Sequence, residues 1–556
     1  MARPKFAMAE IVDEGTGAPA LVGASPQGAA AAPFLLEDFA GLATYRGKPI
    51  YDHEGVIGQI DAGVEFSGKT ISFTFLDGPH TIGIYNNPKY AFDEPEGYSP
   101  MSAAEKTVAR EAMKLWDDLI PQNIVEKNGN GADIVFANTT TGPAQAWAYY
   151  PGKGVKVSSD VWTADPSVNW TNDWLQYDGY GRTTIIHEAG HALGLSHPGD
   201  YNFGDDGPDP DTLPDPITYL GDAFYAQDSE QYSIMSYFGP QETGGQPVNG
   251  ALLLVGNAQT PLLHDILTLQ AKYGADPTTR TGDTNYFANS NAGNPVYDLA
   301  QNPYPYLAVY DAGGTDTFDF STANRSVFLD LRPGSFSSAA AGAVTVAQAN
   351  AILTAFNAAT DAAQGDFPLY TTQAQVDADA DFLGTLGHNR VLNDTGISGI
   401  FATTHRNISI AYNTVIENAA GGSARDYLVG NHVSNQLKGN GGDDVINGLG
   451  GNDWLWGGAG ADEFRFFDNP GNDTIVDFLS GTDTIYLTEI DANLGVAGNQ
   501  AFAFIGAAAF TGAAGQLRSY TSGGSNFVAG DVNGDGIADF TIATGASQAV
   551  LSDFFL

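Results

Sequence analysis

The chain has 556 residues, enough for about four domains, although extended β architectures form fewer and larger units. Its 65 acidic and 23 basic residues give a formal net charge of −42, which excludes nucleic acid and anionic membranes as natural partners. It has no cysteine and no apolar run near 18 residues, which excludes disulfide stapling and a membrane-spanning helix. Such a chain is suited to binding cations.

Residues 1–45 are rich in Ala, Gly and Pro without a sustained period, which is typical of a leader or prosegment. The start, "MARPKFAMAEIVDEG", has no continuous apolar segment behind its basic residues. We therefore expect no conventional N-terminal signal peptide.

Residues 46–275 predict an α/β domain. Strands are expected within 69–78, 132–138 and 146–152, and helices within 102–120, 181–194 and 260–274. The last two helices each end at a glycine, a common stop signal. The helix at 102–120 has one apolar face, made by residues at three- and four-residue spacings: Val108, Ala112, Leu115, Trp116 and Leu119.

Three of the nine histidines lie within "HEAGHALGLSHPGD" (187–200). Residues i and i+4 share one face of a helix, so His187 and His191 can bind one metal ion at about 2.1 Å. Gly194 allows the chain to turn and return His197 as a third ligand, with a fourth position left for water. Glu188 is placed to accept a proton from that water. HExxH alone can arise by chance, but the third histidine favours a metal site.

The extended motif HExxHxxGxxH resembles the metzincin metallopeptidases, and "YSIMSYF" (232–238) is similar to their Met-turn, with Met235 beneath the metal. Within that group, "HPGDYN" and "SIMSYF" resemble the serralysins, bacterial proteases of the repeats-in-toxin class. The resemblance implies a secreted zinc endopeptidase. Its implied fold is an α/β zincin-like (metzincin) catalytic domain followed by an all-β parallel β-roll or β-sandwich domain.

The resemblance also assigns two features around the metal. Tyr237 matches the tyrosine that ligates zinc in the resting enzyme and stabilises the oxyanion when substrate binds; a buried core tyrosine is the alternative. "AWAYYPG" (146–152) resembles the edge strand to which a peptide substrate adds as an antiparallel strand, although short aromatic strands are commonly part of a core.

Residues 276–556 form the second predicted domain, with an alanine-rich helical insertion at about 337–404. Five consecutive nonapeptides begin at 421, 430, 439, 448 and 457, each with Gly at position one. Their eighth residues are apolar and expected to point inward: Leu428, Leu437, Ile446, Leu455 and Phe464. A disordered Gly/Asp-rich linker is the alternative.

In a parallel β-roll two nonapeptides complete one coil, so turns 18 residues apart stack. Asp426, Asp444 and Asp462 then form one column, and Asn435 and Asp453 form the other. Carboxylates and turn carbonyls make an oxygen cage suited to Ca²⁺. The first coil departs from the pattern, because Ala424 and Val433 replace glycine and Asn435 replaces aspartate.

Upstream, "TRTGDT" (279–284), "DAGGTDTF" (311–318) and "VIENAAGG" (415–422) resemble serralysin calcium segments at the domain junction. The family threonine before the glutamate is Val415 here, which is compatible only with a backbone contact. With the repeats, the predicted calcium ligands are Arg280, Gly282, Thr284 (by carbonyl oxygen), Asp311, Gly313, Gly314, Asp316, Glu417, Asp426, Gly439, Gly442, Asp444, Gly448, Gly451, Asp453, Gly457, Gly460 and Asp462.

Two segments near the end allow two interpretations each. "DVNGDGIADF" (531–540) has the one-three-five oxygen offsets of an EF-hand loop but Ile542 at position twelve, so an acidic hairpin is equally compatible. "SDFFL" (552–556) resembles the C-terminal signal of type I secretion, with an ordinary final strand as the alternative.

The resemblance implies protein or peptide substrates, one catalytic Zn²⁺, several structural Ca²⁺ ions, a proteinaceous inhibitor and type I secretion machinery as partners, and a monomeric chain. The competing hypothesis is a repeats-in-toxin adhesin or surface-layer component with an inactive protease half. The intact set of His187, Glu188, His191, His197 and Tyr237 argues against it.

Overall fold

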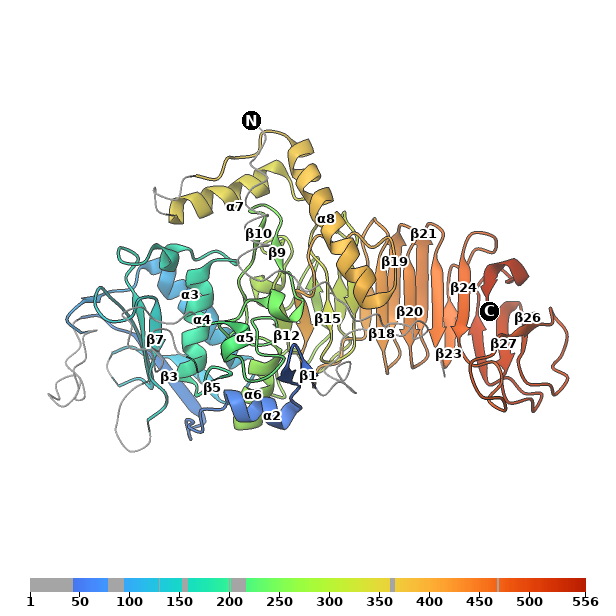
Figure 1. Ribbon diagram of the computed structural model, residues 1–556, viewed down its shortest axis with the longest axis horizontal. Helices are drawn as coiled ribbons and strands as arrows, with labels where there is room; N and C mark the ends of the chain where they lie inside the picture. The colour runs from blue at the N-terminus through green and yellow to red at the C-terminus, as the bar shows by residue number, and fades with distance from the viewer. Residues whose placement is uncertain are drawn as a thin grey trace.

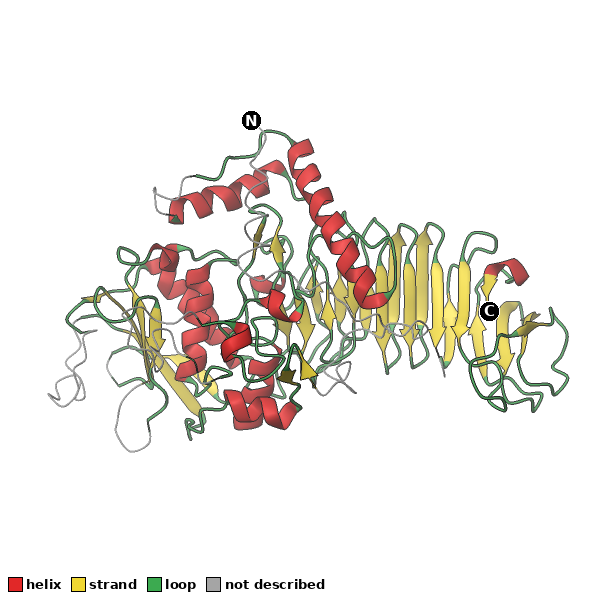
Figure 2. Cartoon of the chain, in the orientation of Figure 1, coloured by secondary structure: helices red, strands yellow, loops and turns green. Residues whose placement is uncertain are grey.

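The computed structural model describes residues 44–78, 95–129, 131–152, 159–199, 201, 217–360, 366–467 and 470–556. The predicted leader therefore lies almost wholly outside the described residues. The molecule is elongated, with helices and a small sheet at one end and a long stack of strands at the other (Figures 1 and 2). In the part of the chain that is described, no helix is both long and apolar enough to cross a bilayer.

The N-terminal half is built on a mixed sheet ordered β5-β3-β6-β8-β7, with β4 paired to β6. Strands β3, β5, β6 and β8 run parallel, whereas β7 is antiparallel to β8 at the edge. This arrangement confirms the predicted strands near 70, 134 and 146. Their bounds are β3 Thr70–Phe75, β4 Tyr98–Ser99, β5 Asn123–Glu126, β6 Ile134–Thr139, β7 Ala146–Ala148 and β8 Ser159–Ala164.

Helices α3 (Ala103–Asp117) and α4 (Tyr180–Ala192) pack against each other beside this sheet. A capping box between Ser102 and Glu105 begins α3, and the predicted apolar face is buried. The other helical segments are α2 His53–Ile60, η2 Trp170–Asp173, α5 Tyr219–Asp222, η3 Pro240–Thr243 and α6 Leu263–Tyr273. Two short hairpins are β1 Thr44–Tyr45 with β2 Lys48–Pro49, and β9 Val248–Asn249 with β10 Leu254–Val255.

The C-terminal half contains two large sheets that face each other across an apolar core. The ten-stranded sheet is, in spatial order, β11 Asn285–Phe287, β13 Thr317–Asp319, β17 Asn418–Ala420, β19 Gln436–Gly441, β21 Trp454–Ala459, β23 Asn472–Ile475, β28 Phe540–Ala543, β27 Ser525–Asp531, β26 Gln516–Ser522 and β25 Ala503–Phe504. The six-stranded sheet is β14 Phe328–Asp330, β18 Tyr427–Asn431, β20 Val445–Leu449, β22 Glu463–Phe467, β24 Thr484–Glu489 and β29 Phe554–Phe555. A third, three-stranded sheet is β12 Leu307–Val309, β16 Ile408–Ile410 and β15 Phe336–Ser337, and short helical turns are η4 Pro295–Tyr297 and η5 Leu551–Asp553.

The nonapeptides form the coils predicted from their period. Successive units alternate between the two large sheets, and strands 18 residues apart pair in parallel, as Leu428 does with Ile446 and Leu437 with Leu455. All five position-eight side chains are completely buried. The disordered-linker alternative is therefore wrong for the described repeats.

The predicted insertion contains two helices, α7 (Val346–Ala359) and α8 (Gln373–Thr395). Its expected first residue, Ser337, still belongs to strand β15, so the helical part is shorter than predicted. Phe356 of α7 packs edge-on against Trp174 of the N-terminal half at 4.8 Å between ring centroids. In Figure 1, α8 runs from α7 toward the strand stack beside β18.

The two ambiguous C-terminal segments both form β structure. Residues 531–540 connect β27 to β28 as an antiparallel hairpin, and Asp531 accepts hydrogen bonds from the backbone N–H groups of Gly534 and Gly536. Strand β29 pairs in parallel with β24, so the final residues complete the six-stranded sheet.

Candidate metal centres

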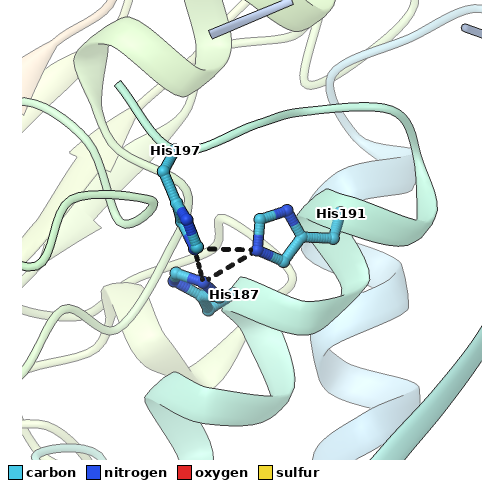
Figure 3. A group of neighbouring side chains, drawn as sticks. All are labelled: His187, His191 and His197. Carbon is cyan, nitrogen blue, oxygen red and sulfur yellow. Dashed lines mark hydrogen bonds between the residues drawn. The ribbon is translucent and has the colours of Figure 1, made fainter. Parts of the chain in front are cut away.

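The three histidines of the predicted motif converge where α4 ends. The Nε2 atom of His187 lies 3.1 Å from that of His191 and 3.3 Å from that of His197, and the last two are 3.0 Å apart (Figure 3). His187 and His191 share one face of α4, and His197 returns after the turn, as the spacing predicted. The sequence interpretation of their convergence is confirmed.

Each imidazole is held by a hydrogen bond on its other nitrogen. The Nδ1 atoms of His187, His191 and His197 lie 2.7, 2.7 and 3.0 Å from the carbonyl oxygens of Ile234, Leu195 and Tyr201, respectively. A carbonyl only accepts, so each Nδ1 carries the proton and each Nε2 presents a lone pair. Three lone pairs this close repel one another unless a cation lies among them. The residues present therefore fit a bound metal ion.

Electrostatics favours the neutral imidazoles that metal binding requires. Burial lowers the pKa of His187 to about 4. Burial, followed by the adjacent His187 and His197, holds the pKa of His191 well below its ordinary value.

Two glycines of the motif allow this close packing. A Cβ atom at Gly190 would lie 2.8 Å from Sδ of Met235 and 3.1 Å from Cζ2 of Trp116. Met235 is fully buried, and its Sδ atom packs against α4 at Gly190, between the two histidines of the helix. Gly194 has φ of +92°, and a Cβ there would collide with the carbonyl oxygen of Val64.

Glu188 and Tyr237 both lie beside the histidines. Burial raises the pKa of Glu188 to about 8, and its Oε2 atom is buried without a hydrogen-bond partner. The Tyr237 ring lies 4.4 Å from the His197 ring, centroid to centroid, and is 39% exposed. The buried-core alternative for Tyr237 is therefore wrong. A cation at the histidines would favour the charged form of Glu188 and so oppose the effect of burial.

Sequence reasoning missed the residues that hold the Met-turn in place. The Asp265 carboxylate accepts hydrogen bonds from Ser233 Oγ at 2.6 Å and from the backbone N–H of Ile234 at 2.8 Å. Trp116 Nε1 donates to the carbonyl of Ile186, immediately before His187, at 3.1 Å. Asp265 occupies the first turn of α6, which the sequence predicted at 260–274, but no sequence spacing connects it to residue 234.

Strand β7 has the properties expected of an accessible edge. It is the last strand of its sheet, and Trp147 and Tyr150 are 39% and 43% exposed. Tyr150 lies edge-on to His191 at 5.8 Å between ring centroids. Trp147 and Tyr150 therefore lie outside the core, whereas Ala148 and Tyr149 of the same segment pack against it.

The repeat turns bring the predicted acidic columns together. The backbone N–H of Asp426 donates to Asp444 Oδ1 at 2.8 Å, that of Asp444 to Asp462 Oδ1 at 2.9 Å, and that of Asn435 to Asp453 Oδ1 at 2.9 Å. The second carboxylate oxygen of Asp444, Asp453 and Asp462 is buried without a partner. Each of these Oδ2 atoms lies against the position-one glycine of its own repeat, Gly439, Gly448 or Gly457, where a Cβ would displace it.

Burial, and after it neighbouring carboxylates, raises the pKa of these groups: to about 7 for Asp444, about 8 for Asp453 and about 6 for Asp462. These carboxylates are buried, repel one another and each keep an unpaired oxygen. Such a group is suited to binding a cation. Gly442, Gly451 and Gly460 lie in these stacked turns and have positive φ values. A Cβ atom on any of them would overlap the backbone of the turn one coil earlier.

The first coil differs, as its degenerate sequence suggested. Both Asp426 oxygens accept backbone hydrogen bonds, from Val327 and Gly422. Asn435 directs its side-chain N–H to the carbonyl of Glu417 at 2.9 Å. Neither side chain leaves an unpaired oxygen, so the structure gives no independent support for a calcium ligand at these two positions.

The columns also extend past the five recognised repeats. Asp473 accepts from the backbone N–H of Asp453 at 2.9 Å, and Asp483 from that of Asp462 at 3.1 Å. Their offsets are 20 and 21 residues, so the strict nonapeptide period does not identify them.

Where the sequence predicts the domain junction, Asp311, Asp316 and Glu417 lie close together. Glu417 accepts from the backbone N–H of Asp316 at 2.7 Å, Thr284 N–H donates to Asp316 Oδ1 at 2.7 Å, and Asp316 Oδ2 is buried without a partner. Burial, then the charges of Asp311 and Glu417, raises the pKa of Asp316 to about 7. A Cβ at Gly314 would lie 2.5 Å from the carbonyl oxygen of Gly282, which faces this group.

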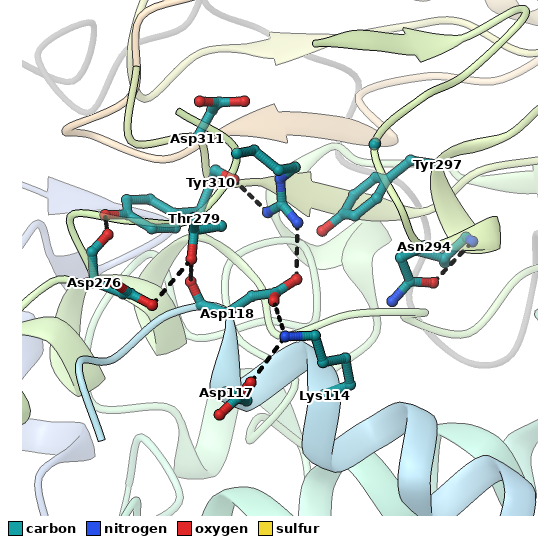
Figure 4. Close-up of polar contacts among 12 residues, drawn as sticks. Lys114, Asp117, Asp118, Asp276, Thr279, Asn294, Tyr297, Tyr310 and Asp311 are labelled. Carbon is teal, nitrogen blue, oxygen red and sulfur yellow. Dashed lines mark hydrogen bonds and ion pairs between the residues drawn. The ribbon is translucent and has the colours of Figure 1, made fainter. Parts of the chain in front are cut away.

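Arg280 is predicted as a calcium ligand through its carbonyl, but its side chain makes a separate contact. Its guanidinium donates to Asp118 at 2.8 Å and to Tyr286 Oη at 3.0 Å, and Tyr286 in turn donates to Asp311 at 2.7 Å. Figure 4 shows the surrounding polar network, in which Lys114 also contacts Asp118. The ion pair joins the end of α3 to the C-terminal half.

Comparisons with known proteins agree with this geometry. The family described as "Peptidase M10 serralysin C terminal" matches residues 275–365 and 379–556, so the gap in the match falls inside the helical insertion. Metallopeptidase AprA of Pseudomonas marginalis is 33% identical over 536 residues, which cover 93% of this chain and 94% of that protein. Metalloprotease AprA of Pseudomonas entomophila (strain L48) is 32% identical and covers 95% and 96%, and a serralysin of Proteus mirabilis is 35% identical and covers 55% and 65%.

The similarity and the site together define a metalloendopeptidase. The chain belongs to the serralysin family.

Proposed function

We propose that the chain is a secreted, zinc-dependent endopeptidase with a metzincin catalytic domain at about residues 46–275. His187, His191 and His197 would hold the zinc, joined by Tyr237 in the resting state. The convergence of three Nε2 lone pairs within 3.3 Å carries the proposal. Tetrahedral zinc with bonds of about 2.1 Å separates its ligand nitrogens by roughly 3.4 Å, close to the observed spacing.

Zinc, when bound, supplies a Lewis acid that activates water and polarises the scissile carbonyl. Glu188 would accept the proton from the attacking water and deliver it to the leaving amine, a role suited to a buried carboxylate without a protein partner. Tyr237 would donate a hydrogen bond to the oxyanion. Strand β7 would bind an extended peptide along its open edge, with its backbone groups supplying the pairing.

We infer that the C-terminal half, at about residues 276–556, requires bound calcium to fold. The orphaned oxygens of Asp316, Asp444, Asp453 and Asp462 support this, since each is costly to bury alone and each is a hard ligand. One site saturated at 100 times its dissociation constant adds about 2.7 kcal/mol of stability, so four sites add about 11 kcal/mol. That is comparable to the whole stability of a typical domain, about 5–15 kcal/mol.

Calcium-dependent folding suits export through a channel, because a chain kept unfolded at low cytosolic calcium can fold outside the cell. The same proposal includes a prosegment within 1–45, a C-terminal signal for type I secretion and a proteinaceous inhibitor. They rest on the family resemblance.

The catalytic proposal is tested by two variants with metal analysis. Glu188→Gln should retain zinc through dialysis but lose about 10² to 10⁴ in the rate of peptide hydrolysis, the usual contribution of a general base. His197→Ala should lose zinc itself, whereas His432→Ala, an exposed histidine in the repeats, should not. Near-normal turnover by zinc-loaded Glu188→Gln, or full zinc occupancy in His197→Ala, would overturn the assignment.

The calcium proposal is tested by hydrogen exchange and mass spectrometry on the full chain. In chelator, peptides from 405–556 should exchange nearly completely, and millimolar Ca²⁺ should restore protection cooperatively. Protection in chelator equal to that in calcium would show that the ion is not required for folding.

A further inference from the structure

The two large sheets of the C-terminal half have outer faces with different surroundings. On the six-stranded sheet, Phe328 and Tyr427 stack at 5.3 Å between ring centroids and are buried in a cluster with Val391 of α8. The insertion therefore covers the outward aromatic side chains of that sheet. Among the described residues, no comparable helix packs on the outer face of the ten-stranded sheet.

The outer face of the ten-stranded sheet carries a row of residues that are cross-strand partners. The row runs through six successive strand pairs. From β17 to β26 the row reads Asn418, Gln436, Trp454, Thr474, Ala543, Phe527 and Tyr520. The neighbours that alternate with them, such as Leu455 and Ile475, are fully buried in the core. The row therefore lies on the solvent side of the sheet.

Aromatic rings on this face are accessible and held in place. Trp454 is 53% exposed, and its ring lies 6.0 Å from that of Trp456 with a tilt of 32°. Lys438 lies 5.2 Å above the Trp456 ring. Farther along the row, Tyr520 and Phe527 stack at 5.6 Å.

The face is also poor in charge. From β17 to β28 the outward positions within the strands hold no carboxylate: Asn418, Ala420, Gln436, Lys438, Trp454, Trp456, Asn472, Thr474, Thr541 and Ala543. This stands out in a chain of net charge −42. A polyanion would be repelled by the molecule as a whole. A polycation would find carboxylates only at the margins of this face, at Asp319 opposite Ala420 and at Asp477 beside the end of β21.

We propose that this face, centred on Trp454 and Trp456, binds an uncharged polysaccharide chain. The apolar faces of pyranose rings stack on exposed aromatic side chains, and sugar hydroxyls both donate and accept hydrogen bonds, as the side chains of Asn418, Gln436 and Asn472 do. The site lies on the strand stack that contains β21, whereas helix α4, which carries His187 and His191, lies in the N-terminal half (Figure 1). It would hold the protease on a glycan-coated surface while the catalytic half acts on protein.

The test uses the full chain in millimolar calcium with cellohexaose and chitohexaose as soluble probes, measured by titration calorimetry, and with insoluble cellulose and chitin in sedimentation assays. Trp454→Ala combined with Trp456→Ala should weaken binding at least tenfold. Phe382→Ala, which removes an aromatic side chain 48% exposed on α8, should leave binding unchanged. All variants should hydrolyse a protein substrate at the wild-type rate and keep the calcium-dependent melting temperature.

Four results would overturn the proposal. The first is that the wild-type chain binds neither oligosaccharide at millimolar concentration. The second is that the variant with both Trp454→Ala and Trp456→Ala binds as tightly as the wild type. Binding confined to an anionic polymer such as alginate, and abolished by salt, would assign a different ligand. Light scattering that showed a wild-type dimer converted to monomer by the tryptophan substitutions would identify the face as a contact between copies of the chain.

Discussion

Replacing Gly190 with alanine should damage the metal centre without touching a ligand. Gly190 lies between His187 and His191 in helix α4, where alanine would ordinarily be the better residue by about 1 kcal/mol. The structure reverses that expectation, because the added methyl group would point at the buried Met235 and Trp116.

The size of the effect follows from the contacts. The new Cβ would lie 2.8 Å from Met235 Sδ and 3.1 and 3.4 Å from Cζ2 and Cη2 of Trp116. Favourable carbon contacts lie at about 3.5–4.0 Å, so α4 or its neighbours must shift by several tenths of an ångström or more. Overpacking of this kind costs about 1–3 kcal/mol, which exceeds or cancels the gain in helix propensity. Any shift is transmitted to both histidines of the helix.

A matched control lies in helix α2. Gly58 is also a helix-interior glycine, it is exposed, and a Cβ there would meet nothing within 4 Å. Gly58→Ala should therefore raise the stability of the protein by about 0.5–1 kcal/mol. The assay compares calcium-saturated melting curves, zinc content after dialysis and kcat/KM for a peptide substrate. Gly190→Ala should lose zinc more readily and turn over more slowly.

The reasoning fails if Gly190→Ala behaves like Gly58→Ala, with a higher melting temperature, full zinc content and unchanged kcat/KM. That result would mean that Met235 and Trp116 can move aside at no cost.

Three further results are expected. Tyr237→Phe should retain zinc and lose activity mainly in kcat, because the contribution proposed for its hydroxyl is made to the developing oxyanion. A change confined to KM would contradict that role. Trp116→Phe should cost more than about 1 kcal/mol in stability, because it removes both the hydrogen bond to the α4 backbone and part of a completely buried ring. Unchanged melting would show that neither contact supports α4. Burial raises the pKa of Asp444, Asp453 and Asp462 to about 7, 8 and 6, so the folded repeats bind protons more tightly than the unfolded chain does. Without calcium, protonation of these carboxyls should therefore stabilise the repeats most below about pH 4. This stabilisation should be lost as the pH rises through the three pKa values. The β-sheet signal in circular dichroism, followed in chelator from pH 8 down to pH 4, measures this regain of structure. Asp444→Asn, Asp453→Asn and Asp462→Asn combined should flatten the profile.

Features set by local spacing could be predicted from the sequence. The i, i+4 histidines require only a helix, and the stacking of Asp444 on Asp462 requires only a constant period of nine residues. The same period predicts that Leu437 and Leu455 lie in the core. In each case the physical constraint repeats along the chain, so a pattern in the sequence is sufficient.

The period stops where the spacing between stacked turns grows to 20 and 21 residues. Asp473 and Asp483 continue both columns there, because parallel pairing requires matched strands and tolerates longer turns between them. A longer loop costs little extra closure entropy, so the fold continues where the repeat does not. Sequence reasoning could recognise the motif but not its geometric continuation.

The contacts missed entirely are those that join distant parts of the chain through one side chain. The family motif concerns only the backbone carbonyl of Arg280, yet its guanidinium pairs with Asp118, 162 residues away, at the end of α3. Two residues earlier on α3, Trp116 supports the α4 backbone next to His187. Helix α3 therefore contacts the proposed calcium-binding junction at its end and the histidine helix along its side. That dual role depends on the packing of three elements, and neither periodicity nor a family motif contains the information to predict it.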